Sequence, residues 1–184
     1  MFWQFLIEYQ AVFASILTLI VTLFATHILR NMGKINFTFS SVQFNIQYRN
    51  SYGEIIEVER ITDKTIEDLH GAVLRFELIL YNKSETLKSL SNFQIECITK
   101  SNNIKLPIRY MLMSKPNENT TITYGYELKL VNLIPKNMSY YILESYLSTD
   151  YINKEEYFIY LICKNNNGRA IRKKISPHPF IIFK

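Results

Sequence analysis

The alternation of hydrophobic and polar positions divides the chain into two parts. Residues 9–29 form a run of 21 positions without a formal charge, between Glu8 and Arg30. After Gly33, apolar and polar residues alternate with a period of two, which is typical of strands that bury one face. The pattern predicts an N-terminal helix followed by a β domain.

The uncharged run has the length of a membrane-spanning helix, because about 20 helical residues cross the hydrocarbon core of a bilayer. A cleaved secretory signal would have a positive N-terminal flank and a small-residue cleavage site. Here the flank has no Lys or Arg, and Ala25 and Thr26 precede His27 and the bulky Ile28. We therefore predict an uncleaved anchor. A buried helix of a soluble protein is the alternative, but it would have a polar face.

These boundaries predict four segments. They are a short flank over 1–8, a transmembrane helix over 9–30, a linker over 31–34 and a β domain over 35–184. Trp3 and Tyr9 lie before the span, whereas His27, Arg30 and Lys34 lie at its end or beyond it. Because Lys and Arg near a span favour the cytoplasmic side, we predict the N-terminus outside and the domain in the cytoplasm.

Small residues recur at every fourth position within the predicted span. They are Ala14, Thr18, Thr22 and Thr26, which fall along one side of a helix. Small side chains let helix backbones approach closely in lipid. The spacing predicts a packing stripe for self-association or for pairing with another span. The alternative is that small residues are simply tolerated there.

The first strand pattern changes phase part-way along. Apolar residues alternate over 35–39 and then over 42–48 in the opposite phase, with Ser40 and Ser41 between them. A change of phase moves side chains to the other face of a sheet. We therefore predict a β-bulge or a strand break at these two serines.

Other alternating segments predict further strands. They cover 54–61, 72–82, 92–98, 104–110, 122–130, 137–144, 157–163 and 169–175. Polar residues at 82–89 predict a loop, and those at 63–70 predict a short helical turn. Pro107 indicates an edge strand. Residues 157–163 are apolar on both faces and too short for a membrane span, which favours a central strand.

Eight or nine strands without a long helix between them predict a mainly β domain. The best match is an antiparallel Ig-like or C2-like β-sandwich, and a small closed β-barrel is the alternative. The inward positions include 72, 74, 76, 78 and 80 of one strand and 93, 95 and 97 of the next. The single tryptophan is Trp3, so the chain lacks the Cys-Trp-Cys core of antibody domains.

Charge adds a second asymmetry. All 21 Lys and Arg residues follow Leu29, together with 15 of the 16 acidic residues, so the β domain carries the positive charge. A basic domain suits anionic lipid or nucleic acid. A lysine-rich residue usage would have the same effect. Abundant Ile, Asn, Lys and Tyr fit an AT-rich genome, which favours a bacterial or phage source.

One cluster stands out within this charge. It consists of Lys164, Arg169, Arg172, Lys173 and Lys174, which we interpret as a basic face. Cations on an edge strand block edge-to-edge aggregation. Contact with anionic lipid headgroups is a second interpretation, and binding of a phosphate-bearing ligand is a third. No aromatic pattern of an RNA-binding motif accompanies the cluster, so nucleic acid is not expected.

Residues with catalytic potential are few. The chain has neither a glycine-rich phosphate loop nor a nucleophile elbow. His70, beside Glu67 and Asp68, is the one candidate base. Cys97 and Cys163 lie in apolar strand patterns, which predicts buried free thiols. We predict no catalytic, cofactor or metal site, and therefore no enzyme.

Two stretches carry a family resemblance. FELILYNKSETLKSLSNFQIE and VNLIPKNMSYYIL lie within residues 72–143 and resemble uncharacterised bacterial single-span membrane proteins with an Ig-like or C2-like sandwich. The resemblance implies a fold and no residue role. Membrane-tethered β-barrel effectors of antiviral nucleotide signalling are a more distant likeness. Those effectors are associated with two spans, whereas this chain has one.

Together these patterns predict a single-pass protein of the cell membrane without enzymatic activity. It would present a cytosolic β-sandwich to a protein partner or to the membrane surface, with anionic lipid as a further contact. A ligand-gated membrane effector that oligomerises through its transmembrane helix is the alternative, and a hydrolase or transferase is a third hypothesis.

Overall fold

The computed structural model describes residues 9–31, 33–50, 52–59, 69–110, 126–152 and 155–181. Several expectations lie outside these ranges. They concern Trp3, the strand end at 60–61, the acidic residues Glu67 and Asp68, and residues 111–125.

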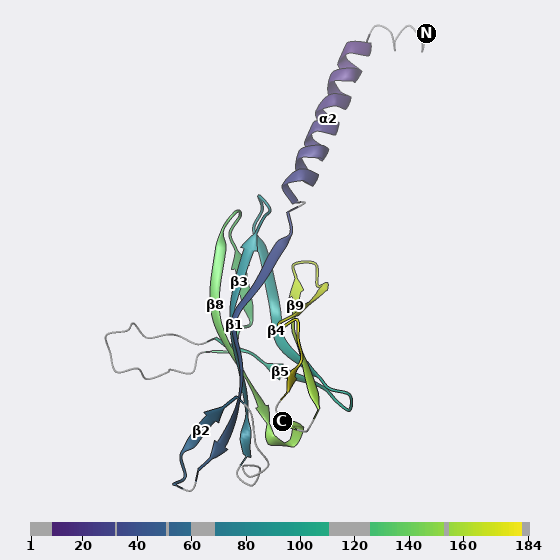
Figure 1. The fold of residues 1–184 in the computed structure, drawn as a ribbon. Coiled ribbons are helices and arrows are strands. Elements are labelled where there is room, and N and C mark those ends of the chain that lie inside the picture. Colours follow the sequence, from purple (N-terminus) through teal and green to yellow (C-terminus); the bar gives the residue numbers. More distant parts are fainter. Residues whose placement is uncertain are drawn as a thin grey trace, which may run out of the picture.

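One helix precedes the strands (Figure 1). The elements, in chain order, are α2 (Gln10–Asn31), β1 (Ile35–Arg49), β2 (Ile55–Val58), β3 (Leu69–Asn82), β4 (Lys88–Ile98), β5 (Asn103–Pro107), β6 (Arg109–Tyr110), β7 (Leu130–Leu133), β8 (Met138–Ser148), the 3-10 turn η2 (Thr149–Tyr151), β9 (Glu156–Asn165), β10 (Ala170–Lys174) and β11 (Phe180–Ile181).

The strands form two antiparallel sheets. The first sheet has the order β2-β1-β3-β8-β6, and the second has the order β10-β9-β4-β5, with β7 on β4 and β11 on β9. The sheets stay separate and pack face to face, as in an Ig-like sandwich. The predicted sandwich is therefore confirmed.

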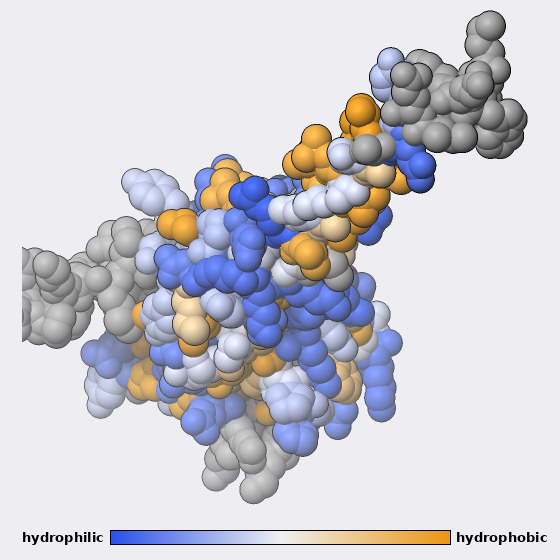
Figure 2. Space-filling view, turned by 90° about the horizontal axis from the view of Figure 1, so that it is seen from above, coloured by the Kyte–Doolittle hydropathy of each residue, from blue (hydrophilic) through white to orange (hydrophobic). Residues whose placement is uncertain are grey.

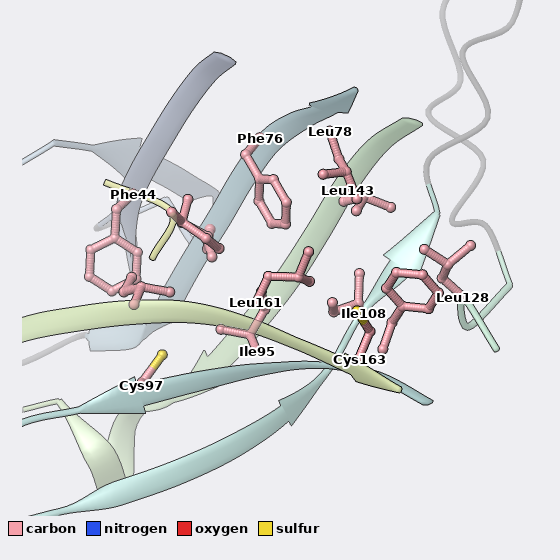
Figure 3. Close-up of a cluster of buried hydrophobic side chains, with 14 of the residues drawn as sticks. Phe44, Phe76, Leu78, Ile95, Cys97, Ile108, Leu128, Leu143, Leu161 and Cys163 are labelled. Atoms are coloured by element: carbon pink, nitrogen blue, oxygen red, sulfur yellow. The ribbon is translucent and has the colours of Figure 1, made fainter. Parts of the chain in front are cut away.

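The core lies between the two sheets (Figure 3). Its largest contribution is the predicted face of β3, where alternate residues 72–80 are at most 2% exposed. They face Phe93, Ile95 and Cys97 of β4 and the alternate residues 157–163 of β9. Each buried Leu or Phe contributes roughly 1.5–3 kcal/mol, so this layer provides most of the driving force for folding.

The predicted bulge in β1 is confirmed. The pairing of β1 with β3 shifts between Ser40 and Gln43, and Ser41 has a φ of 50°. This left-handed residue moves the following side chains to the other face without ending the strand. Phe39 and Phe44 consequently both pack on the core.

A second bulge, which the sequence did not predict, lies in β4, and the strand begins within the predicted loop. The strand begins at Lys88, and its pairing with β9 shifts between Ser91 and Gln94. Asn92 has a φ of 53°, so Leu90 and the residue three positions later are both buried. The prediction of a loop through residue 89 was wrong because this shift disguises the alternation.

The predicted strand at 104–110 is divided between the sheets. β5 pairs with β4 in the second sheet, whereas β6 pairs with β8 in the first sheet. Pro107 lies at the crossing, where its carbonyl accepts a hydrogen bond from Ser145 Oγ at 2.9 Å. Each piece ends its sheet, so the edge position is confirmed.

Two local predictions were wrong. Of the strand expected at 122–130, residues 122–125 lie outside the described ranges, residues 126–129 form only a bridge between Glu127 and Arg109, and the strand itself is β7 at Leu130–Leu133, which pairs with the bulged start of β4. His70 lies in β3, which begins at Leu69, and not in a helical turn.

The central position of β9 is confirmed, and β10 explains the apolar residues on its outer face. The Arg172 guanidinium lies 3.8 Å from the Tyr160 ring centroid, and Lys174 Nζ lies 5.2 Å from that of Phe158. Arg172 Nε also lies 2.7 Å from Oε2 of the buried Glu96. The edge cations therefore cover rings that would otherwise face water.

A polar network crosses the outer face of the first sheet. Arg75 of β3 donates to Glu57 of β2 at 2.8 Å and to Glu144 of β8 at 2.7 Å, and Gln47 of β1 donates to Glu57 at 2.9 Å. The pKa of Glu57 lies below its ordinary value of 4.5, mainly because Arg75 donates to its carboxylate. The guanidinium thus joins β2, β3 and β8, and Glu57 extends the network to β1.

We expect Arg75→Met to lower the free energy of unfolding by about 1–2 kcal/mol at pH 7, because the partly buried Glu57 and the buried Glu144 lose their donor. A lowered pKa contributes stability above pH 4.5 that is lost as the pH falls through the folded value. The variant should therefore lose less stability than the wild type between pH 7 and pH 3. Urea unfolding of the full chain in detergent, followed by circular dichroism, measures both quantities.

Lys129→Met is the matched control. Its 3.8 Å ion pair with Glu127 is exposed, so the cost should be below about 0.5 kcal/mol. Equal acid sensitivity of the wild type and Arg75→Met would contradict the assigned role of the guanidinium.

Candidate functional site: the helix-proximal end of the sandwich

Helix α2 projects from one end of the sandwich (Figure 1). Residues Val12–Arg30 are long and apolar enough to cross a membrane, and none of that window is buried. A buried core helix is therefore excluded for this segment. An exposed apolar helix at this position is compatible with a membrane anchor or with a signal sequence.

The predicted stripe lies along one side of α2. Three threonine hydroxyls donate to the carbonyl four residues earlier: Thr18 to Ala14 at 2.8 Å, Thr22 to Thr18 at 2.7 Å and Thr26 to Thr22 at 2.7 Å. Each hydroxyl is thus satisfied within its own helix, as a lipid environment requires. The stripe offers a small, satisfied surface, and its role in helix packing remains a prediction.

Hydrogen bonds join the end of the helix to the β3–β4 loop, residues 83–87. The backbone N–H of Glu85 donates to Arg30 O at 3.3 Å, and that of Lys83 donates to Lys34 O at 3.2 Å. The last turn of a helix leaves carbonyls without partners inside the helix. Here the loop supplies a donor to one of them, so the sandwich is attached directly to the helix end.

Gly33 is required at this junction. A Cβ at this position would overlap the backbone of Ser84, and its carbonyl accepts a hydrogen bond from Lys88 Nζ. Only glycine permits so close an approach of two backbones. The predicted linker is therefore packed against the domain.

The side chain of Asn82 organises the loops at this end. It is fully buried, and its Nδ2 donates to the carbonyls of Thr86 and Leu133, both at 2.9 Å. Its Oδ1 accepts from the backbone N–H and the hydroxyl of Ser84, at 3.0 and 2.6 Å. One carboxamide thus joins the β3–β4 loop to the end of β7. Sequence reasoning missed this residue, because an Asn at a strand end resembles any other turn residue.

Hydrophilic side chains surround the base of the helix when the molecule is seen from above (Figure 2). The chain turns β3–β4, β7–β8 and β9–β10 all lie there (Figure 1). The junction and these turns carry Arg30, Lys34, Lys83, Lys88, Lys136, Lys164 and Arg169. Glu85 is the one acidic residue among them. The rest of the chain beyond Leu29 has fourteen basic and fourteen acidic residues, so the net positive charge is located at this end.

The five residues of the predicted basic face lie in three places. Lys164 and Arg169 flank the β9–β10 turn beside the helix. Arg172 and Lys174 cover the outer face of β9, whereas Lys173 lies 5.7 Å from the ring centroid of Phe37. The first pair and Lys173 therefore lie toward the helix-proximal end, whereas Arg172 and Lys174 cover rings of β9.

A hollow of about 740 Å³ opens beside the helix junction. Residues from the junction and from four strands or turns line it: Lys34 before β1, Phe37 of β1, Lys88 of β4, Asn166 of the β9–β10 turn and Lys173 of β10. The Oδ1 of Asn166 accepts a hydrogen bond from the Ser89 backbone N–H at 2.6 Å, which fixes the turn against β4. The hollow is open, positively charged and adjacent to the candidate membrane span.

The candidate nucleophiles lie elsewhere and are buried. Cys97 and Cys163 are free thiols in the core, as predicted, and burial raises the pKa of each to about 12. His70 lies on β3 with its ring centroid 6.3 Å from that of Tyr146. Within the described ranges, no group of three His, Cys, Asp or Glu could hold a metal ion.

Comparison with known proteins identifies the sandwich. A family model described as the YopI Ig-like domain matches residues 33–176. The chain belongs to the YopI Ig-like domain family. The YopI match begins at Gly33 and ends after β10, so it covers β1 to β10 of the sandwich and leaves α2 and β11 outside.

Two solved structures are similar to this YopI-family chain. One is the sporulation control protein Spo0M of Bacillus subtilis, 7% identical with a TM-score of 0.39, over 83% of this chain and 49% of that chain. The chain therefore spans about half the length of Spo0M. The other is a FixG-related protein of Vibrio parahaemolyticus, 11% identical with a TM-score of 0.40, over 80% and 95%. No curated protein matches the sequence.

We expect Asn82→Asp to lower the free energy of unfolding by about 2–4 kcal/mol, because a buried carboxylate would face two carbonyls that now accept hydrogen bonds. Denaturant titration of the full chain in detergent measures this loss. Asn137→Asp is the matched control. Its Oδ1 is an exposed acceptor for Met138 N–H, which aspartate also supplies. Equal stability of the two variants would contradict the role of Asn82.

Proposed function

We propose that this YopI-family chain is a membrane-anchored, non-enzymatic binding protein. It crosses the cell membrane once, with its N-terminus outside and its sandwich in the cytoplasm. The observation that carries the proposal is the exposed apolar helix that is hydrogen-bonded directly to an Ig-like sandwich. A helix of this kind needs a lipid environment, and the sandwich supplies a stable platform for recognition.

The charge distribution supports this orientation. Arg30 and Lys34 follow the span, and the strand turns around them add further lysines and an arginine. Basic residues near the end of a span favour the cytoplasmic side. The N-terminal flank carries no Lys or Arg that would favour the cytoplasmic side for that end instead. The opposite orientation, with the domain outside, is therefore disfavoured.

The far end of the sandwich offers the surface for a protein partner. The β1–β2 turn lies there, with Tyr52 88% exposed, and the edge strand β2 exposes Ile55 and Ile56. An edge strand with exposed apolar side chains can pair with an added strand of a partner. A partner bound there would be held away from the bilayer by the length of the domain.

Topology can be tested with single cysteines. Tyr52→Cys should react with a membrane-impermeant maleimide only after cells are permeabilised, whereas Gln4→Cys in the flank should react in intact cells. The native thiols add little background, since burial raises their pKa to about 12. Resistance of the chain to alkaline carbonate extraction would support integral anchoring. Labelling of Tyr52→Cys in intact cells would overturn the orientation, and extraction by carbonate would overturn the anchor.

A second candidate function is an effector that oligomerises through α2 when the domain binds a ligand. The stripe favours it, because the hydroxyls of Thr18, Thr22 and Thr26 donate hydrogen bonds within the helix. The small side chains then leave a surface on which another helix can pack closely.

We expect Thr18→Leu with Thr22→Leu to reduce the oligomeric fraction in detergent by at least tenfold if the stripe forms a helix interface, because two bulky side chains would separate the backbones. Ile16→Phe with Ile20→Phe enlarges the opposite side of the helix and is the matched control. Crosslinking followed by gel electrophoresis measures the fraction. An unchanged oligomeric state in the threonine variant would remove the support for this function.

A further inference from the structure

We propose that the helix-proximal end of the sandwich is a binding surface for anionic lipid headgroups of the bilayer that holds its own anchor. The proposal rests on the proposed membrane anchoring and adds a ligand to it. The ligand chemistry is a phosphate group at the membrane surface, and the surface comprises the hollow beside Gly33 and the turns β3–β4, β7–β8 and β9–β10.

The junction places this surface at the level of the headgroups. The β3–β4 loop donates hydrogen bonds to Arg30 O and to Lys34 O, and Gly33 packs on the backbone of Ser84. A membrane span that includes Arg30 as its last residue therefore ends one loop away from the domain. Charges within about one Debye length, roughly 10 Å, of an anionic surface are attracted to it.

The loop tips combine a cation with an exposed apolar side chain. In the β3–β4 loop, Lys83 is exposed and Leu87 is 58% exposed. In the β7–β8 turn, Lys136 is exposed and Ile134 is 59% exposed. Exposed apolar residues beside lysines are the composition of surfaces that enter the interfacial region of a bilayer, where the apolar group is buried and the cation meets a phosphate.

The hollow supplies donors for a single headgroup. Lys34, Lys88 and Lys173 line the hollow together with the turn residues Asn166 and Asn167. The hollow measures about 740 Å³ and opens beside the end of the helix. Phosphate oxygens accept hydrogen bonds from ammonium and amide groups, so residues of this kind suit a phosphoryl ligand in charge and in hydrogen bonding.

The experiment places the full chain in nanodiscs and follows docking by fluorescence. Leu87→Cys is labelled with an environment-sensitive dye, in discs of phosphatidylcholine alone and in discs with 30% phosphatidylglycerol. We expect a blue-shifted, brighter dye in the anionic discs and its reversal in 1 M salt. Each basic residue near the surface is worth about fivefold in membrane partition, so Lys83→Glu with Lys136→Glu should lower the docked-to-undocked ratio by at least about 25-fold.

Arg49→Glu with Lys100→Glu is the matched control, because it makes the same change of charge at exposed positions of the far end. A dye on Tyr52→Cys should report the same solvent exposure in both lipids. A signal that is equal in neutral and anionic discs, or that is equally lost in the control variant, would overturn the proposal. A blue shift in neutral discs on adding 10 mM inorganic phosphate would overturn the lipid as the source of the phosphate. Failure of the chain to enter nanodiscs of either composition would overturn the anchor itself, independently of lipid binding.

Discussion

The buried carboxamide of Asn82 is the interaction on which the membrane-proximal half of the molecule depends. It ends β3, the strand that contributes most to the core, makes all of its hydrogen bonds inside the protein and orders the loop from which donors reach the end of the helix. Leaving a buried amide without hydrogen-bond partners costs more free energy than a typical hydrogen bond contributes. This end of the domain therefore has one stable arrangement, in which all of the partners of Asn82 are in place. The position of Gly33 against Ser84 follows from it, because the loop backbone must be held in place for the helix to approach.

The sequence predicts the sandwich well where alternation is continuous and fails where a left-handed residue interrupts it. The inward face of β3 is readable because residues 72, 74, 76, 78 and 80 are all apolar and the charged Arg75 and Glu77 lie between them. The bulge at Ser41 is also readable, since the phase changes between two clear apolar runs. At Asn92 the shift is preceded by only one inward apolar residue, Leu90, and the strand start resembles a loop. Pro107 signals an edge, but no local pattern shows that the chain crosses to the other sheet there.

The helix-proximal end was only partly predictable for a different reason. Its cations come from the junction and from three turns that are far apart in sequence, and antiparallel pairing brings those turns to one end. A scan for clusters finds Lys164, Arg169 and the three cations of β10, but strand geometry separates them again. Arg172 is engaged with Tyr160 and Glu96. The density of cations along the sequence therefore overestimates the free positive charge of β10 and underestimates that of the helix-proximal end.

The two ends of the sandwich differ in charge, and this makes the orientation of the domain a property of the whole fold. Acidic residues lie at the far end in the β1–β2 turn, after β8 and at the start of β9; in the described part they are Glu54, Asp150, Glu155 and Glu156. Arg49 and Lys100 lie at the same end, so it carries less positive charge than the helix-proximal end. An anionic membrane surface therefore attracts the helix-proximal end more strongly. Electrostatics and the short junction therefore act in the same direction, and no single lysine has to determine the alignment. Loss of one cation lowers the attraction but leaves the helix-proximal end positive. Reversal of the charge of two lysines at the loop tips removes most of the net positive charge of that end.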